Sequence, residues 1–402
     1  MNRSDWRTVL LVTTWQIAAS ICYYAVFAAT PFFRDAFDLS RFSVGLVVTT
    51  LTLGYAVFLL PLGALTDRFG ERVTLTFGLV GLATGTVLVA AAPTYALLLA
   101  AVFVLGSMYG SAIPGTNKAV FDNVEPGRQN VAMGIKQVGV TGGSGISALL
   151  ITGLAGILFW EAGFLVATGV GLLVAVGFGL AYSSDDGGTA DGYPDFRALL
   201  ANRSYVALTA AGLFLGAALF TTTGYTVLYV EESIGASVAF GGVVLALVQV
   251  FGSVGRVLSG WLSDALPGEP RVSIGLVLIA QSLGSAVTFV VAASTTTGRG
   301  AAVAFSALGF FVLGYTGVYY SVMATLVRAD EMGGATAGGQ LALTSGALVA
   351  PPAFGSLADA TGYRTGWLFL AAVVTVAAAL LVYVVRTPPS VATPAAADTS
   401  DP

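Results

Sequence analysis

The stretch GALTDRFGERV, from Gly63 to Val73, places four charged residues between two long apolar runs. Residues 42–65 before it and 73–92 after it are each long enough, as helices, to cross the roughly 30 Å hydrocarbon core of a bilayer. The whole chain of 402 residues shows the same bias: 56% of its residues are hydrophobic and 9% are charged, with a mean hydropathy of +0.86. Soluble domains carry about 25% charged residues, so this composition predicts an integral membrane protein.

Apolar runs of this length recur along the chain and predict an all-α polytopic membrane protein with twelve transmembrane helices in two pseudo-symmetric six-helix bundles. The widest polar gap is SSDDGGTADGYPDFRALLANR, which is typical of a solvated linker. The expected spans are residues 8–30, 42–65, 73–92, 95–118, 129–152, 157–182, 205–230, 237–262, 272–294, 300–327, 333–357 and 365–386. The expected organisation is an N-terminal bundle over 1–182, a cytoplasmic linker over 183–203, a C-terminal bundle over 204–386 and a disordered tail over 387–402.

A weak internal repeat relates the two halves. GALTDRFGERV, after the second span, corresponds to GWLSDALPGEPRV at 260–272, after the eighth. KQVGVTGG at 136–143 in the fifth span corresponds to GQLALTSG at 339–346 in the eleventh, which aligns Gln137 with Gln340. Two copies of six helices are the layout of transporters that rock around a central site.

The first repeated stretch carries a family signature. GALTDRFGERV resembles the pattern G-x-L-x-D-R-x-G-R-[KR] of the major facilitator superfamily, placed as expected between the second and third helices. The matching residues are Gly63, Leu65, Asp67, Arg68, Gly70 and Arg72. Glu71 replaces a usual basic residue, so one contact of this loop is expected to be absent or rewired. The second copy keeps Gly260, Leu262 and Asp264 but has Ala265 where an arginine would fall.

The resemblance covers essentially the whole chain and implies alternating access between two six-helix bundles. Gly63 is expected to allow close helix approach and Gly70 to supply backbone freedom. Asp67 can lie at the N-terminus of a neighbouring helix, and the arginines can pair across the bundle interface. The residues expected to form this conformational switch are Gly63, Asp67, Arg68, Gly70, Arg72, Gly260 and Asp264.

The basic residues predict the orientation. Of the 17 Lys and Arg residues, eleven fall near helix ends on the side that holds both termini, four fall on the opposite side and two fall within spans. By the positive-inside rule both termini are cytoplasmic. We therefore expect a multi-pass protein of the plasma membrane that acts as a monomer, with the lipid bilayer and a small molecule as its partners and no nucleic acid.

The two basic residues within spans are Lys136 and Arg256. Each lies about eight residues from the cytoplasmic end of its span, or roughly 12 Å at 1.5 Å per residue. A charge at this depth costs about 2.5–3.5 kcal/mol, so it should face a wet cavity or a partner. The alternative is that each side chain snorkels to the headgroups, or that Arg256 pairs near Asp264.

No Asp or Glu lies deep in any predicted span, which leaves these two cations without a counter-ion. An anionic substrate can supply one, because a guanidinium binds a carboxylate bidentately and an ammonium adds a point charge. The arginine in FGSVGRVLSGWLSD, residues 251–264, also resembles the pattern of the monocarboxylate and oxalate/formate transporter branches, which implies contact with a substrate carboxylate. The residues expected to bind substrate are Lys136, Arg256, Gln137, Gln340, Tyr315, Tyr319 and Asn117. Further polar candidates are Tyr23, Tyr24, Tyr225 and Gln249.

Other classes of function are disfavoured by composition. The chain has no histidine and one cysteine, Cys22, which leaves no internal disulfide, Cys-based metal site or usual proton shuttle. No intramembrane His, Asp or Cys cluster is present for acid–base or metal catalysis, and there is no G-x-x-x-x-G-K-[ST] phosphate loop. The sequence predicts no enzyme, no metal and no cofactor. Its first hypothesis is a secondary or facilitative transporter of a small carboxylate, and its alternative is efflux of neutral or lipophilic compounds.

Overall fold

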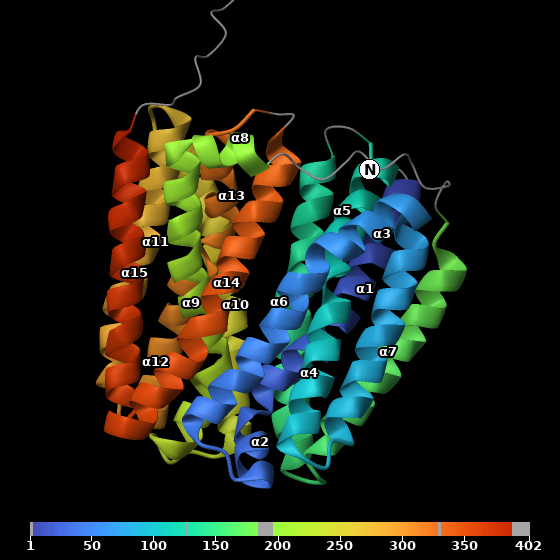
Figure 1. The fold of residues 1–402 in the computed structure, drawn as a ribbon, viewed down its shortest axis with the longest axis vertical. Coiled ribbons are helices and arrows are strands. Elements are labelled where there is room, and N and C mark those ends of the chain that lie inside the picture. Colours follow the sequence, from blue (N-terminus) through green and yellow to red (C-terminus); the bar gives the residue numbers. More distant parts are fainter. Residues whose placement is uncertain (1–2, 126–127, 184–195, 329–330, 388–402) are drawn as a thin grey trace, which may run out of the picture.

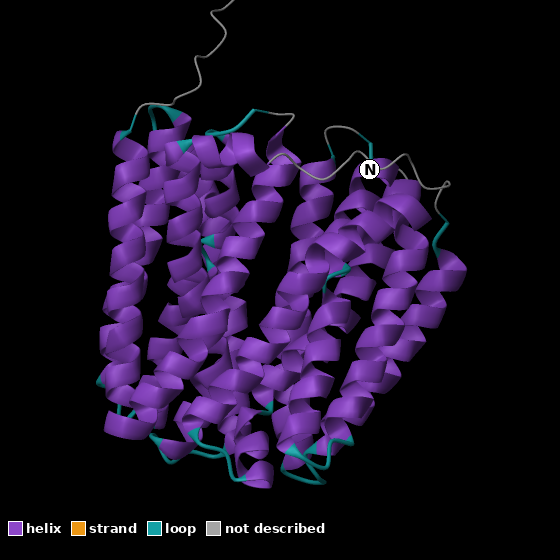
Figure 2. Cartoon of the chain, in the orientation of Figure 1, coloured by secondary structure: helices purple, strands orange, loops and turns teal. Residues whose placement is uncertain are grey.

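The computed structural model describes residues 3–125, 128–183, 196–328 and 331–387, and the regular elements in these ranges are helices (Figure 2). Residues 184–195 of the predicted linker and residues 388–402 of the predicted tail lie outside the described residues. The last part of the predicted linker forms a short helix, α8 (Phe196–Ala201), and α9 begins at Arg203. Leu199 of α8 is buried against the helices beneath it, which explains why this segment is helical rather than solvated.

Eleven helical stretches are long and apolar enough to cross a membrane, and the longest, α3, bends back on itself and supplies two spans. The described chain therefore has the twelve predicted spans. The elements of the first half are α1 (Arg3–Ala28), α2 (Thr30–Phe37), α3 (Arg41–Ala90), α4 (Tyr95–Tyr109), α5 (Ala112–Asn123), α6 (Gln129–Ala155) and α7 (Glu161–Ala181). Those of the second half are α9 (Arg203–Glu232), α10 (Val238–Ala265), α11 (Pro270–Ala293), α12 (Gly298–Leu308), the π-helix η1 (Gly309–Leu313), α13 (Thr316–Ala324), α14 (Met332–Thr361) and α15 (Tyr363–Arg386).

The predicted polar loop between the second and third spans is a sharp kink. All of α3 is helical except Gly70, whose backbone has φ 78° and ψ 159°. An L-residue with a side chain adopts a positive φ at a cost of about 1–2 kcal/mol, whereas glycine does so freely. The expected role of Gly70 is thus met, but the reversal needs one residue rather than a loop.

Two spans are interrupted near their middle, one in each half. The fourth span breaks between α4 and α5 at Gly110 and Ser111, and the tenth passes from α12 through η1 to a break at Gly314 and Tyr315 before α13. These two spans correspond to each other in the repeat. The sequence analysis expected continuous helices here, and the glycines at both breaks explain the difference because they weaken a helix interior.

The helices form two groups, which Figure 1 shows side by side. The first six spans, from α1 to α7, pack against one another, and so do the last six, from α9 to α15. The main contacts between the groups join α3 to α14 and α6 to α10. In the repeat these are the second span with the eleventh and the fifth with the eighth, so the two contacts are related by pseudo-symmetry.

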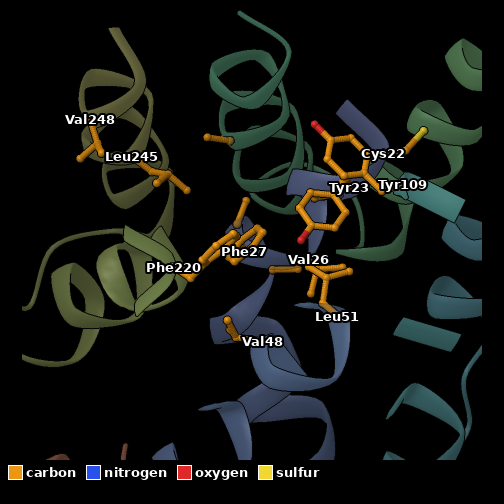
Figure 3. Close-up of a cluster of buried hydrophobic side chains, with 14 of the residues drawn as sticks. Cys22, Tyr23, Val26, Phe27, Val48, Leu51, Tyr109, Phe220, Leu245 and Val248 are labelled. Atoms are coloured by element: carbon orange, nitrogen blue, oxygen red, sulfur yellow. The ribbon is translucent and has the colours of Figure 1, made fainter. Parts of the chain in front are cut away.

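The ends of the molecule differ. We call the end that holds the N-terminus and α8 the N-terminal end, and the opposite end the α2 end (Figure 1). The ribbons of the two groups approach each other at the α2 end and diverge toward the N-terminal end. Near the α2 end, Phe27 of α1 lies 6.4 Å from Phe220 of α9, centroid to centroid, in an apolar cluster that also includes Leu245 of α10 (Figure 3). Buried side chains from both groups thus seal this level.

Ion pairs add to this seal. The Glu232 carboxylate at the end of α9 accepts from Nε of Arg41 at 2.8 Å and from Nη2 at 2.7 Å, and it also pairs with Arg34 of α2. Asp359 of α14 accepts from the backbone N–H groups of Arg41 and Phe42 at 3.1 and 3.0 Å. Its negative charge therefore lies at the positive N-terminus of α3, which is a favourable position.

Candidate functional site

Arg256 projects from the second group toward the first. It lies on the same face of α10 as Ser253, whose hydroxyl donates to Thr141 of α6 at 2.8 Å. The rings of Tyr24 on α1, Tyr109 on α4 and Tyr315 are near enough to interact electrostatically with the guanidinium. Arg256 therefore lies among aromatic residues of both groups rather than at a headgroup or at Asp264, which is exposed.

The guanidinium is held by one atom. Nε donates to the backbone oxygen of Leu313, the last residue of η1, at 3.1 Å. Within the described residues, neither Nη nitrogen of Arg256 hydrogen-bonds to the protein and no carboxylate lies within ion-pair distance of it. The two Nη nitrogens form the planar fork that binds a carboxylate bidentately.

Lys136 is arranged differently. It is 3% exposed, and its ammonium donates to the Oδ1 atom of Asn117 on α5 at 2.6 Å. It shares a face of α6 with Gly139, where the helix touches Thr13 and Gln16 of α1. The ammonium thus points into the first group, toward a neutral amide. In the described ranges it also has no carboxylate partner.

The two cations lie at a similar depth. The antiparallel helices α6 and α10 meet where Gly242 faces Thr152 and again where Ser253 contacts Thr141. Continuing this register places Arg256 opposite position 138 of α6, about 3 Å along the axis from Lys136. The two residues therefore lie at the predicted equivalent depth, although the Arg256 side chain faces the first group and the Lys136 side chain points into its own group.

A tyrosine cluster from the first group borders Arg256. Tyr23 and Tyr109 stack with ring centroids 4.0 Å apart, as Figure 3 shows, and Tyr55 lies 5.7 Å from Tyr109. Gln16 donates its amide to the Tyr109 hydroxyl at 3.3 Å and so fixes that ring. The sequence analysis did not select Tyr109 or Gln16, although the position of Tyr109 directly before Gly110, within an apolar span, was a usable signal.

The hydroxyls of Tyr23 and Tyr315 and the Nε2 atom of Gln249 are buried and have no hydrogen-bond partner in the described structure. Gln249 lies one turn from Ser253 on the face of α10 that carries Arg256. Unsatisfied buried donors are costly, at about 1–3 kcal/mol each, and rare. Of the three, Tyr315 interacts electrostatically with Arg256, so its hydroxyl is a candidate to bind a ligand held by the guanidinium.

The remaining predicted residues are more scattered. Gln340 of α14 accepts from the Tyr320 hydroxyl at 2.5 Å and donates to Thr344 at 3.3 Å. Tyr319 is fully buried within the second group, where its hydroxyl approaches the Gly339 oxygen at 3.5 Å. Gln137 is exposed, one turn from Thr141 on the face of α6 that packs against α10. At Gln137 this face of α6 is exposed, whereas at Thr141 it is buried against α10.

The predicted switch residues lie at the N-terminal end, and the contacts of the two arginines among them are within the first group. Arg72 donates from Nε and Nη2 to the Gly179 oxygen of α7 at 3.1 and 2.6 Å, while Arg68 lies over the Phe69 ring. The expectation that these arginines pair across the interface is not met in this conformation. The reason is that a carbonyl group at the end of α7 accepts from Arg72, while Arg68 packs on the ring of the next residue. Asp67 and Asp264 are exposed.

Two further expectations about this loop have clear outcomes. A Cβ atom at Gly63 would make only ordinary contact with Pro114, at 3.8 Å, and one at Gly260 would meet nothing within 4 Å, so neither glycine is required for close packing here. Glu71 is buried and accepts from the Tyr182 hydroxyl at 2.9 Å. Burial and the Glu71 carboxylate raise the pKa of Tyr182, which keeps this donor protonated. The contact at Glu71 is thus rewired to the end of α7.

The groups at this centre, a cation and hydrogen-bond donors, are suited to binding a ligand. Among the described residues no group of three or more His, Cys, Asp or Glu side chains could hold a metal ion. A cationic fork, unsatisfied hydroxyl and amide groups and two interrupted helices meet between two helix groups that are related by a repeat. This arrangement defines a membrane transporter with a central site.

The family comparison agrees with that class. Residues 14–337 match the model of the Major Facilitator Superfamily, so the chain belongs to this family of transporters and is not an enzyme. It is 26% identical over 382 residues to a hexuronate transporter of Bacillus subtilis (strain 168), covering 89% of each chain. It is 27% identical over 336 residues to monocarboxylate transporter 13 of Rattus norvegicus, covering 78% of this chain and 74% of the relative.

The fold has a counterpart among solved structures. A bacterial homologue of the human lysosomal transporter Spinster, solved in an inward-facing and occupied conformation, superimposes with a TM-score of 0.81. The two chains are 17% identical, and the match covers 96% of this chain and 98% of the other. At this identity the similarity establishes the fold alone, which is the all-helical, multi-pass architecture that the sequence predicts.

Proposed function

We propose that this transporter carries a small organic anion, a carboxylate, whose charge is met by Arg256. The observation that carries the proposal is the guanidinium itself: it lies between the two groups, uses only Nε on the protein and has no acidic partner among the described residues. A partly buried cation without a counter-ion is unfavourable, and a bound carboxylate reduces that penalty. The relatives named for hexuronate and monocarboxylate transport support this substrate class.

Around the charge, the substrate body would lie against Tyr24, Tyr109 and Tyr315. The unsatisfied hydroxyl of Tyr315 and amide of Gln249 favour a substrate that also carries hydroxyl groups. Lys136 adds positive potential from the facing helix while Asn117 holds its ammonium. Gln340 and Gln137 would line the path toward the N-terminal end, and Tyr319 would support the site from behind.

We infer that the described conformation opens toward the cytoplasm. Basic residues near the helix ends place the N-terminal end on that side of the plasma membrane. Alternating access then requires that the seal at the α2 end breaks, including the ion pairs of Arg41 with Glu232 and Asp359. At the same time the switch residues must form new contacts between the groups at the N-terminal end. These residues are Gly63, Asp67, Arg68, Gly70, Arg72, Gly260 and Asp264. The proposed movable units are 1–182 and 204–386, joined by 183–203.

The proposal is tested by uptake of radiolabelled D-glucuronate, a hexuronate, and of L-lactate into proteoliposomes that contain the purified protein. Uptake by the unaltered protein is expected for at least one of these carboxylates, with loss in Arg256→Ala and reduction in Lys136→Ala. Uptake that survives both substitutions would rule the proposal out. If neither carboxylate enters, the same liposomes are to be tested for export of a neutral lipophilic compound, which is the alternative on this fold.

A further inference from the structure

The segment that holds Arg256 is a π-helix. Residues Gly309–Leu313 of the tenth span form η1, in which backbone hydrogen bonds run from residue i to i+5 instead of i+4. The wider turn displaces carbonyl groups from their regular partners and makes them available to side chains. Single π-turns of this kind occur often at functional sites, and this one ends at the carbonyl that Arg256 contacts.

Two side chains from neighbouring helices use the carbonyl groups of η1. Arg256 donates to the Leu313 oxygen. Gln281 of α11 is 4% exposed, and in the amide orientation that matches donors to acceptors its nitrogen donates to the Phe311 and Phe310 oxygens at 3.2 and 3.3 Å. Its oxygen then accepts from the hydroxyl of Ser259 on α10. Gln281 therefore links η1 to α10 at Ser259, one turn beyond Arg256.

The backbones fit closely around this turn. A Cβ atom at Gly255, directly before Arg256, would overlap the Phe310 carbonyl group, and one at Gly309 would overlap the backbone of Val248. Glycine at these positions brings α10 against η1. Because the approach is backbone to backbone, the distance between the Cα atom of Arg256 and the Leu313 oxygen depends on the shape of the π-turn.

We propose that Gln281 is a positioning residue for Arg256, acting through the π-turn. By holding the Phe310 and Phe311 carbonyls, Gln281 fixes η1 in the shape that presents the Leu313 oxygen to Nε. With Nε held, the guanidinium plane is fixed and both Nη nitrogens face the first group as a preformed fork for a carboxylate. This inference rests on the proposed function, since it specifies how the anion-binding residue is held.

The test is the Gln281→Leu variant, which keeps the volume but removes the amide. D-glucuronate uptake into proteoliposomes should show a KM raised about tenfold with an unchanged maximal rate, because binding and not movement is impaired. In an Arg256→Lys background the same substitution should add less than a twofold change, since lysine has no Nε–H donor to position. Thr288→Val is the matched control, because among the described residues Thr288 is a buried polar residue of α11 that bonds only to its own helix, and the KM of this variant should be unchanged.

Other outcomes overturn the inference. An unchanged KM in Gln281→Leu, a fall in maximal rate alone, or an equal loss in the Arg256→Lys background would each show that Gln281 does not position the guanidinium. If Gln281→Leu does not fold, Ser259→Ala removes the hydroxyl that orients the amide and should raise the KM in the same way, whereas an unchanged KM would contradict the inference. If instead Arg256→Gln leaves uptake intact, the proposed function fails, which is a distinct result.

Discussion

Lys136 and Arg256 lie at corresponding depths in facing helices, yet their charged groups point in different directions and have different partners. The ammonium of Lys136 turns into its own group and rests on Asn117, whereas the guanidinium of Arg256 turns toward the other group with its fork unoccupied by protein in the described structure. The difference shows that depth within a span does not assign a role. What distinguishes the two residues is whether a neutral side chain of the protein already accepts a hydrogen bond from the charged group.

The largest expected effect is on kcat/KM, which should fall much more when Arg256 is replaced than when Lys136 is replaced. Arg256→Gln should lower kcat/KM for carboxylate uptake at least about 30-fold, because loss of a hydrogen-bonded charge pair costs about 2–5 kcal/mol and each 1.4 kcal/mol is tenfold. Lys136→Met should lower it about tenfold, through loss of a longer-range attraction. Initial uptake rates across substrate concentrations measure both values. Equal losses in the two variants would remove the contrast between them.

The next effect concerns geometry rather than charge. Arg256→Lys keeps the positive charge but replaces the planar fork by a point charge. We expect kcat/KM to fall about tenfold, between the unaltered protein and Arg256→Gln, because one of two charge-assisted bonds is lost. The same uptake assay measures it. Full activity in this variant would mean that charge alone suffices and that the fork is not used.

The free energy of unfolding should report on Lys136 and its acceptor. Asn117→Leu leaves the Lys136 ammonium buried without its acceptor and should cost about 1–3 kcal/mol in the free energy of unfolding. Adding Lys136→Met removes the orphaned charge, so the double variant should be more stable than Asn117→Leu alone. Thermal unfolding in detergent measures the order. A double variant less stable than the single one would show that Asn117 has another structural role.

The smallest effect tests the contact between the helices that carry the two cations. Ser253→Ala removes the neutral hydrogen bond to Thr141, which is worth about 1 kcal/mol. Uptake kinetics should change by less than about threefold, because no charge is involved. A loss as large as that of Arg256→Gln would show that the hydroxyl at Ser253 itself binds substrate.

Much of the architecture follows from the sequence. Runs of apolar residues fixed the number and order of spans because a bilayer demands helices of a set length, and the motif from Gly63 to Val73 indicated the family. The sequence could not reveal that Gly70 alone makes the reversal in α3, nor that Arg72 binds the end of α7, because both depend on where neighbouring helices come to lie.

The site was only partly predictable for the same reason. Charge within a span identified Lys136 and Arg256, since burial of a cation is costly wherever it occurs. The π-turn that holds Arg256, and the partners Asn117 and Leu313, come from packing between helices distant in sequence. Gln137 and Gln340 correspond in the repeat but differ in surroundings, since the helices around them are not arranged identically.

The most direct measurement compares a carboxylate with its uncharged isostere. D-glucuronate and D-glucuronamide differ by one charge, and their competition with labelled D-glucuronate can be measured in the unaltered protein and in Arg256→Gln. We expect the unaltered protein to prefer the carboxylate at least about 30-fold and the variant to prefer neither. A preference for the carboxylate that persists without Arg256 would contradict the account.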